Sequence, residues 1–161
     1  MRVIGIDPGS SVTGYGVLDD AGRDPRVIVA GVIKTGRGAL ALRLWRILEE
    51  VERLLVDHQP EAMAVEEIFF ARNAKSAMVL GHARGAALAA AGRAKIEVFE
   101  YAPRKVKQTV TGYGGAGKEQ VRDILRATLG QIPDQLDASD ALAVALCHLR
   151  WADAPRPEGA R

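Results

Sequence analysis

The chain has a single cysteine, few aromatic residues and no long hydrophobic run. Cys147 lies in the apolar stretch ALAVALC, which favours a small buried side chain in a reducing compartment over half of a disulfide and hence predicts a cytoplasmic protein. No segment reaches the ~18 apolar residues that a membrane helix needs, and the first residues enter a strand pattern directly. We therefore expect neither a membrane span nor a targeting segment.

An excess of one charge is also lacking, because 22 Lys and Arg stand against 20 Asp and Glu. The overall charge therefore predicts neither a nucleic-acid nor a membrane partner, although a local basic surface remains possible. The three histidines lack metal-ligand spacing and are interpreted as structural. The stretch GGAGKEQ lacks the hydroxyl residue that a nucleotide-binding P-loop requires.

The length of 161 residues predicts one domain, over 1–151, followed by a disordered tail at 152–161. The predicted fold class is α/β, with a mixed five-stranded sheet flanked by helices: a three-stranded antiparallel meander followed by alternating strands and helices. Strands are expected at 3–6, 14–19, 26–35, 62–70 and 95–101. Helices are expected at 39–58, 73–92, 104–112, 118–130 and 136–151.

Four carboxylates stand at unusual places. Asp7 and Glu66 each end an apolar strand run, where functional groups of α/β sheets often lie. Asp137 and Asp140 are three residues apart, on one face of a helix that is apolar all round beyond them. Each acid also has a local interpretation: a turn for Asp7, an exposed strand end for Glu66, and for the pair an N-cap (Asp137) with a first-turn charge (Asp140).

Taken together, the four acids favour a metal site. Carboxylates gathered in one cleft repel, and they stay ionised together only beside compensating cations. Divalent ions with oxygen ligands, Mg²⁺ or Mn²⁺, meet this need. Two such ions can activate a water and stabilise the leaving oxygen in phosphodiester cleavage.

The motifs GIDPGS, VTGYGV, AVEEIFFARN, FEYAPRKVKQTVTG, GKEQV and DASDALA resemble the RuvC family of Holliday junction resolvases over about residues 2–150. The resemblance implies a ribonuclease H-like fold and a metal-dependent endonuclease that nicks four-way DNA junctions symmetrically in recombination and repair. It carries the catalytic and metal-binding roles onto Asp7, Glu66, Asp137 and Asp140, with two Mg²⁺ or Mn²⁺ per site. It also implies a homodimer and the branch-migration partners RuvA and RuvB.

The segment 104–122 holds five basic residues against Glu119 alone, around the glycine-rich stretch GYGGAG. Its residues alone fit a solvated helix face with a flexible loop as well as a phosphate-binding surface. The resemblance favours DNA and also suggests that Phe69, with Phe70 as alternate, engages unstacked bases. The DNA-binding candidates are Phe69, Arg72, Asn73, Arg104, Lys105, Lys107, Tyr113 and Lys118.

A two-fold dimer is expected because symmetric nicking needs two active sites. The candidate interface is the helix at 73–92, whose Gly81, Gly85 and 86–91 permit close approach, although this face could instead pack on its own sheet.

Three other functions remain open. An actin-like ATPase would need a second domain, a noncatalytic junction-binding protein would not need the acids, and a related nuclease could act on another nucleic acid such as an RNA·DNA hybrid.

Overall fold

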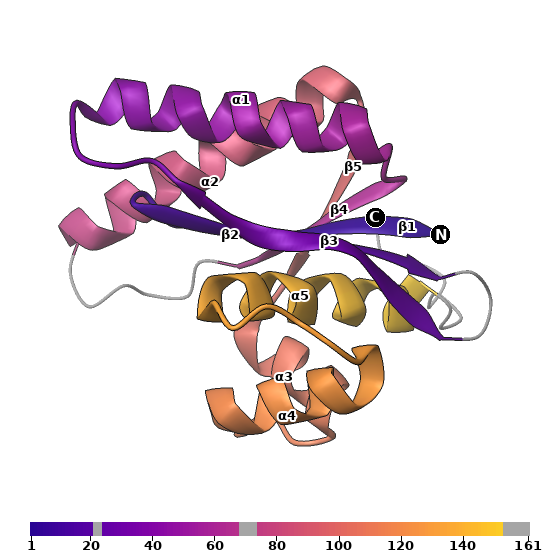
Figure 1. The fold of residues 1–161 in the computed structure, drawn as a ribbon. Coiled ribbons are helices and arrows are strands. Elements are labelled where there is room, and N and C mark those ends of the chain that lie inside the picture. Colours follow the sequence, from indigo (N-terminus) through magenta and orange to yellow (C-terminus); the bar gives the residue numbers. More distant parts are fainter. Residues whose placement is uncertain (21–23, 68–73, 153–161) are drawn as a thin grey trace, which may run out of the picture.

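A five-stranded sheet in the order β3-β2-β1-β4-β5 lies between two layers of helices (Figure 1). The structure, a computed structural model, describes residues 1–20, 24–67 and 74–152. The strands are β1 (Arg2–Asp7), β2 (Val12–Asp20), β3 (Pro25–Lys34), β4 (Ala62–Glu66) and β5 (Glu97–Tyr101). The helices are α1 (Leu40–His58), α2 (Ala74–Ala94), α3 (Pro103–Thr111), α4 (Lys118–Leu129) and α5 (Leu136–Ala152).

The sheet is mixed, as the sequence predicts. Strands β1, β2 and β3 form an antiparallel meander, while β4 pairs in parallel with both β1 and β5. The predicted elements are all present, and the largest difference is at β4, which ends at Glu66. Positions 68–70 of the predicted strand lie outside the described residues. Ala152 belongs to α5 and not to the predicted tail, whose remaining residues 153–161 lie outside the described part.

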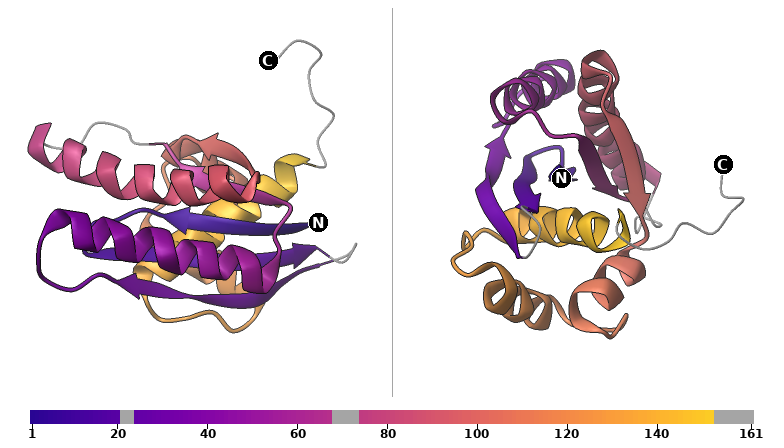
Figure 2. Two further views of the ribbon diagram at one scale, coloured as in Figure 1. Left: turned by 90° about the horizontal axis from the view of Figure 1, so that it is seen from above. Right: turned by 90° about the vertical axis from the view of Figure 1, so that its right-hand side faces the viewer.

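Each face of the sheet has its own hydrophobic core. Helices α1 and α2 cover one face, and α5, backed by α3 and α4, covers the other (Figure 2). Alternate residues of β1 divide between them, because Val3 packs on the α5 side and Ile4 and Ile6 pack on the α1–α2 side. None of the described helices is long and apolar enough to cross a membrane.

Helix α5 is enclosed between the sheet and α3–α4, which explains why it is apolar all round: every residue of 141–149 is buried. Cys147 is buried as a free thiol, and the buried ring of His148 lies with Nδ1 2.8 Å from the Tyr101 hydroxyl, so both side chains belong to the core. Asp137 is not the N-cap, because the helix already begins at Leu136.

Glycines bring α5 into direct contact with the sheet. A Cβ on Gly5 would overlap the carbonyl oxygen of Ala141, and one on Gly14 would overlap that of Asp137. Gly16, which pairs with Gly5 across the β1–β2 ladder, would similarly meet Leu142. Only residues without a side chain allow this approach, so the three glycines determine how close the acidic end of α5 lies to β1.

We expect Gly14→Ala to lower the free energy of unfolding by about 3 kcal/mol, because the new methyl group meets backbone that cannot rotate away. Chemical denaturation measures this loss. Gly92→Ala is the matched control, since a Cβ at Gly92 meets nothing within 4 Å. Equal stabilities of the two variants would contradict the packing argument.

Candidate active site

The four predicted carboxylates come together at one edge of the sheet. Asp7 ends β1 and Glu66 ends β4, and these neighbouring strands run parallel, so their carboxyl ends meet. Gly14 is the ladder partner of Asp7 and touches the first turn of α5. The glycine contact therefore places Asp137 and Asp140 beside the two strand-end acids.

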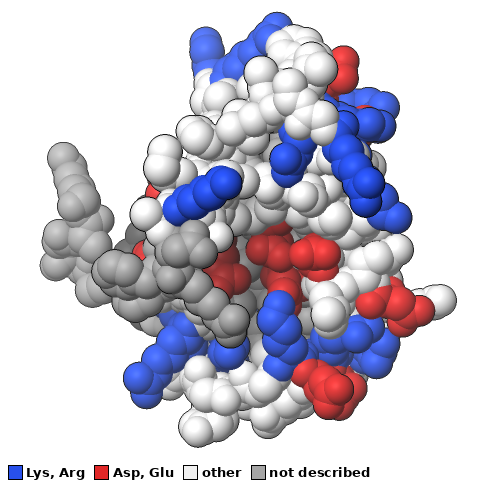
Figure 3. Space-filling view, turned by 90° about the vertical axis from the view of Figure 1, so that its left-hand side faces the viewer, with Lys and Arg blue, Asp and Glu red and all other residues white. Residues whose placement is uncertain are grey.

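A cleft of about 260 Å³ opens at this edge. It is lined by Asp7, Pro8, Glu66, Glu67, Leu80, Pro103, Lys118 and Asp140. Figure 3 shows this face of the molecule, with acidic side chains gathered in a hollow and Lys and Arg side chains around it. An adjoining hollow of about 190 Å³ shares Glu66, Lys118 and Asp140 with the cleft and extends to Lys107. The site is thus acidic at its centre and basic at its rim.

Neighbouring carboxylates help to raise the pKa values of Asp7 and Glu66. Burial, the largest cause, and the charges of Asp140, Glu66 and Asp137 together raise the pKa of Asp7 from 3.8 to about 7. The pKa of Glu66 is also raised, first by burial and then by Asp140. Such mutual repulsion is what the joint reading of the four acids predicts, and it identifies a site that favours added positive charge.

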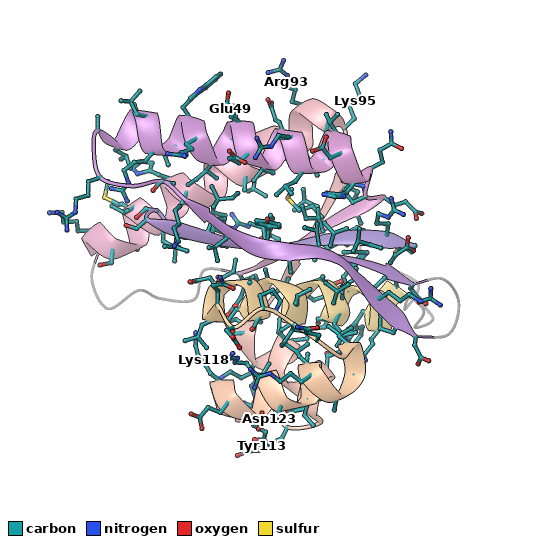
Figure 4. The ribbon with its side chains drawn as sticks, in the orientation of Figure 1. Glu49, Arg93, Lys95, Tyr113, Lys118 and Asp123 are labelled. Carbon is teal, nitrogen blue, oxygen red and sulfur yellow. The ribbon has the colours of Figure 1, made fainter. Side chains whose placement is uncertain are left out.

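Lys118 supplies part of that charge. Its Nζ lies 2.7 Å from Oδ2 of Asp140, and this hydrogen bond raises the pKa of the ammonium group. The same ammonium lowers the pKa values of Asp7 and Glu66. As the first residue of α4, Lys118 opposes the helix dipole, so the acidic cleft and not the helix explains its position. Figure 4 shows it directed from α4 towards the N-terminal end of α5.

The turn after Asp7 is held by residues other than Asp7. The carbonyl oxygen of Ser10 accepts hydrogen bonds from Nε of Arg43 (3.0 Å) and Oγ1 of Thr35 (2.7 Å). Thr13 Oγ1 accepts from the N–H of Gly9 at 3.3 Å. Among the described residues, these hydrogen bonds hold the turn without the Asp7 carboxylate.

The donor set suits a hard divalent cation. Four carboxylates offer only oxygen ligands, and a bound cation would relieve the repulsion that raises the pKa of Asp7. Within the described segments, no three acidic, histidine or cysteine side chains already converge closely enough to hold one ion. Asp140 instead binds Lys118, so a cation would have to draw the carboxylates together.

The basic segment divides between the cleft and other contacts. Lys107 and Lys118 line the two hollows. The ammonium of Lys105 instead lies 3.6 Å from the ring centre of Trp151, and Arg104 packs against the space above Gly114. Tyr113 is 64% exposed on the connection between α3 and α4, away from the sheet (Figure 4).

The remaining predicted DNA contacts lie outside the described residues. These are Phe69 with its alternate Phe70, Arg72 and Asn73, which fall in 68–73. The structure also places residues at the site that the sequence did not single out. Glu67 lines the cleft, and its position directly after Glu66 was the only signal. Arg43 and Thr35 brace the Asp7 turn over long sequence separations, for which no local pattern exists.

The chain matches the family model described as "Crossover junction endodeoxyribonuclease RuvC" over residues 3–148. A protein of that name from Halorhodospira halophila is 48% identical over 156 residues, which cover 96% of this chain and 93% of the relative. Another, from Geobacter sulfurreducens, is 49% identical over 155 residues, with 94% of each chain covered.

Solved structures agree with this similarity. "T. thermophilus RuvC in complex with Holliday junction substrate" superposes with a TM-score of 0.90 at 40% identity and covers 94% of both chains. The yeast mitochondrial resolvase Ydc2, at 12% identity and a TM-score of 0.67 over 92% of this chain and 79% of its own, shares the fold alone. By family match, sequence identity and structure, the chain belongs to the RuvC family of crossover junction endodeoxyribonucleases.

Proposed function

We propose that the protein is a structure-selective endonuclease that resolves four-way DNA junctions by paired symmetric nicks, in homologous recombination and repair. The main support is that Asp7, Glu66 and Asp140 line one cleft with a basic rim, and that Asp137 lies near enough to raise the pKa of Asp7. A relative of 40% identity is described in complex with a Holliday junction, and the superposition extends over 94% of this chain. The described helices and sheet form one body, so residues 1–151 are proposed as the nuclease domain.

The four carboxylates are proposed to hold divalent cations, Mg²⁺ or Mn²⁺, two in each site. When bound, such ions activate a water and stabilise the leaving oxygen of a phosphodiester. The chain's own residues do the rest. Lys118 holds Asp140 through a hydrogen bond, and its positive charge lowers the pKa values of Asp7 and Glu66. Arg43 and Thr35 hold the turn that follows Asp7.

The basic rim is proposed to bind the phosphate backbone, and the residues at 68–73 to engage bases at the junction. Lys107 and Lys118 lie beside the acids, where phosphate oxygens must approach. Lys105 faces Trp151 and Arg104 packs over Gly114, so their DNA contacts are proposed at the edge of the surface. Tyr113 is exposed enough for a peripheral contact.

Cleavage of a labelled synthetic four-way junction tests the proposal beside a linear duplex of the same arm sequence. Each substrate is incubated with Mg²⁺, Mn²⁺ or EDTA. Paired nicks confined to the junction, and abolished by EDTA, are expected. Junction binding without cleavage in either metal would favour a noncatalytic junction-binding protein. Cleavage of an RNA·DNA hybrid in preference to the junction would favour a nuclease with another substrate.

Lys107→Ala is expected to weaken junction binding without moving the cut positions. Each lost phosphate contact removes roughly one unit from the slope of log affinity against log salt concentration. Titration of a labelled junction at several salt concentrations measures both quantities. Lys95→Ala serves as the control, because Lys95 follows α2 and lies on the other side of the sheet from α3, which carries Lys107 (Figure 4). An unchanged slope for Lys107→Ala would contradict its phosphate contact.

A homodimer is proposed to bind the junction, with α2 as the interface. Helix α2 divides its small residues between two faces: Ala83, Ala87 and Ala90 are buried in the protein's own core, whereas Gly81 and Gly85 face open space. The alternative of packing on the sheet therefore holds for one face only, and the other allows close approach of a second copy.

Light scattering is expected to give twice the chain mass, and Gly85→Arg to give the monomer, because its long side chain would fill the contact. Ala89→Ser, a small change on the same exposed face, should leave the dimer intact. A wild-type monomer at micromolar concentration would contradict the interface.

RuvA and RuvB are proposed as cellular partners, and the cytoplasm as the location.

A further inference from the structure

One stretch of the chain carries positive charge that the site does not use. Residues 25–48 contain five basic residues and no Asp or Glu, in a protein whose charges otherwise nearly cancel. This stretch comprises β3, the following connection and the first half of α1. Its basic residues are Arg26, Lys34, Arg37, Arg43 and Arg46.

Four of these five residues lie at the end of the sheet that holds the cleft. Lys34 ends β3 and pairs with Val12, just after the turn that follows Asp7. Arg43 reaches the same turn through its hydrogen bonds to Ser10. Arg37 lies in the connection between Lys34 and α1, and Arg46 lies one helical turn beyond Arg43. Lys34, Arg37, Arg43 and Arg46, with Trp45, are here named the β3–α1 corner.

The charge of the β3–α1 corner is not balanced within the protein. Lys34, Arg37 and Arg46 are exposed, and Arg43 is half-buried. Among the described residues, none of the four forms an ion pair with a carboxylate. Other arginines of the surface do, including Arg2 with Asp19 and Arg84 with Glu100. Four cations without carboxylate partners favour an anionic partner from outside the protein.

An exposed aromatic ring accompanies these cations. Trp45 is 58% exposed and stands on α1 between Arg43 and Arg46. Leu42, three residues before it, is 69% exposed, so two neighbouring apolar side chains lie on the solvent face of the first turns of α1. Flat apolar rings among guanidinium groups are typical of nucleic-acid surfaces, where they pack on sugars or bases while the cations bind phosphates. A purely ionic partner would leave the indole without a contact.

The β3–α1 corner shares a face with the cleft. Figure 3 views the molecule from the side of this sheet end and shows Lys and Arg side chains above the acidic hollow as well as below it. Figure 4 labels Lys118 below the sheet, on the side of α4, and shows the α1–α2 layer above the sheet. A substrate that reaches the carboxylates from solvent therefore passes between two basic borders.

We propose that the β3–α1 corner is a second DNA-binding surface, which holds the phosphate backbone of a duplex arm as it leaves the cleft. The inference rests on the proposed function, because it takes the DNA bound at the carboxylates as its starting point. Arg37 and Arg46 bind phosphates, and Trp45 packs against the sugar edge of the same strand. Arg43 contributes its charge while it braces the turn after Asp7.

The double variant Arg37→Gln, Arg46→Gln tests the proposal in salt-dependent junction binding. About a tenfold rise in Kd near physiological salt is expected, and the salt slope should fall by roughly two units, one for each phosphate contact. The cut positions and the rate at saturating enzyme should remain those of the wild type, since neither residue touches the cleft. The matched control is Arg26→Gln, Lys95→Gln, which removes two exposed charges from the far end of the sheet.

The result separates this inference from the proposed function. If wild-type protein fails to bind and cut the junction, the proposed function itself fails. If the wild type cuts normally while the double variant keeps its Kd and slope, only the second surface is overturned. An equal loss in the control pair also overturns it, because a general charge effect then replaces a local contact.

Trp45 offers an independent readout through fluorescence in a Trp151→Phe background, since the chain has only two tryptophans. Acrylamide is expected to quench Trp45 strongly in the free protein and several-fold less with a cleavage-resistant junction bound. Quenching that the junction leaves unchanged overturns the contact. Quenching that is already weak without DNA overturns it as well, because another copy of the chain then covers the surface.

Discussion

Asp7→Asn is expected to abolish junction cleavage, with a loss of ~10³-fold or more, equivalent to about 4 kcal/mol in the activation barrier. An amide keeps the size of the side chain but removes the negative charge from the centre of the carboxylate group. The divalent cations would then lose one of their proposed carboxylate ligands. Single-turnover cleavage with enzyme in excess measures the loss.

Junction binding by this variant should stay within about threefold of wild type, because phosphate contacts come from the basic rim. Glu119→Gln, an exposed acid next to Lys118 on α4, is the matched control and should cut normally. Cleavage by Asp7→Asn at near wild-type rates would refute the assignment of Asp7 as a metal ligand. Loss of binding together with cleavage would instead indicate that the turn after Asp7 has collapsed.

The same substitution should stabilise the metal-free protein. Because the pKa of Asp7 rises from 3.8 to about 7 on folding, the folded state holds its proton more tightly than the unfolded state. Stability from this group is therefore complete below pH 3.8 and is lost as the pH rises through about 7. The rise corresponds to at most about 4 kcal/mol above pH 7, which an uncharged amide recovers.

Denaturation in EDTA at pH 5 and pH 8 measures this effect. The stability gain of Asp7→Asn over wild type should be larger at pH 8 than at pH 5, and between about 1 and 4 kcal/mol at pH 8. Saturating Mg²⁺ should stabilise the wild type and reduce the difference, because ligands that bind only the folded state raise its stability. A gain that does not depend on pH would contradict the burial of a repelled carboxylate.

The fold was largely predictable because its elements have strong local signals. The apolar spacing of residues 39–58 and the stop at Pro60 predict α1, which begins at Leu40 and ends at His58 with Gln59 in the left-handed conformation. Three β-branched runs separated by glycine breaks likewise predict the meander. The end of β4 was less predictable, because IFF continues the apolar run beyond Glu66 without a change in pattern.

The candidate site was only partly predictable from residue types. The four acids repel one another only if the fold brings their side chains close together, and no local sequence pattern predicts that it does. Gly5, Gly14 and Gly16 decide it by admitting α5 onto the sheet, but two of them appear in the sequence only as GYG within a strand. The basic residues of 104–122 look alike in the sequence, yet Lys107 lines the cleft while Lys105 packs on Trp151.

By itself, the sequence determined the family, the order of strands and helices, and the four candidate acids, because motifs and periodicity are properties of neighbouring residues. Only the tertiary structure decided which side chains share a cleft, how far burial raises the pKa of Asp7, and that Lys118 pairs with Asp140. It also gathered, at the sheet end that holds the carboxylates, basic residues of β3 and α1 that form no ion pair within the described part of the chain. These features depend on contacts between residues far apart in the chain, which the packing of α5 and α1 on opposite faces of the sheet creates.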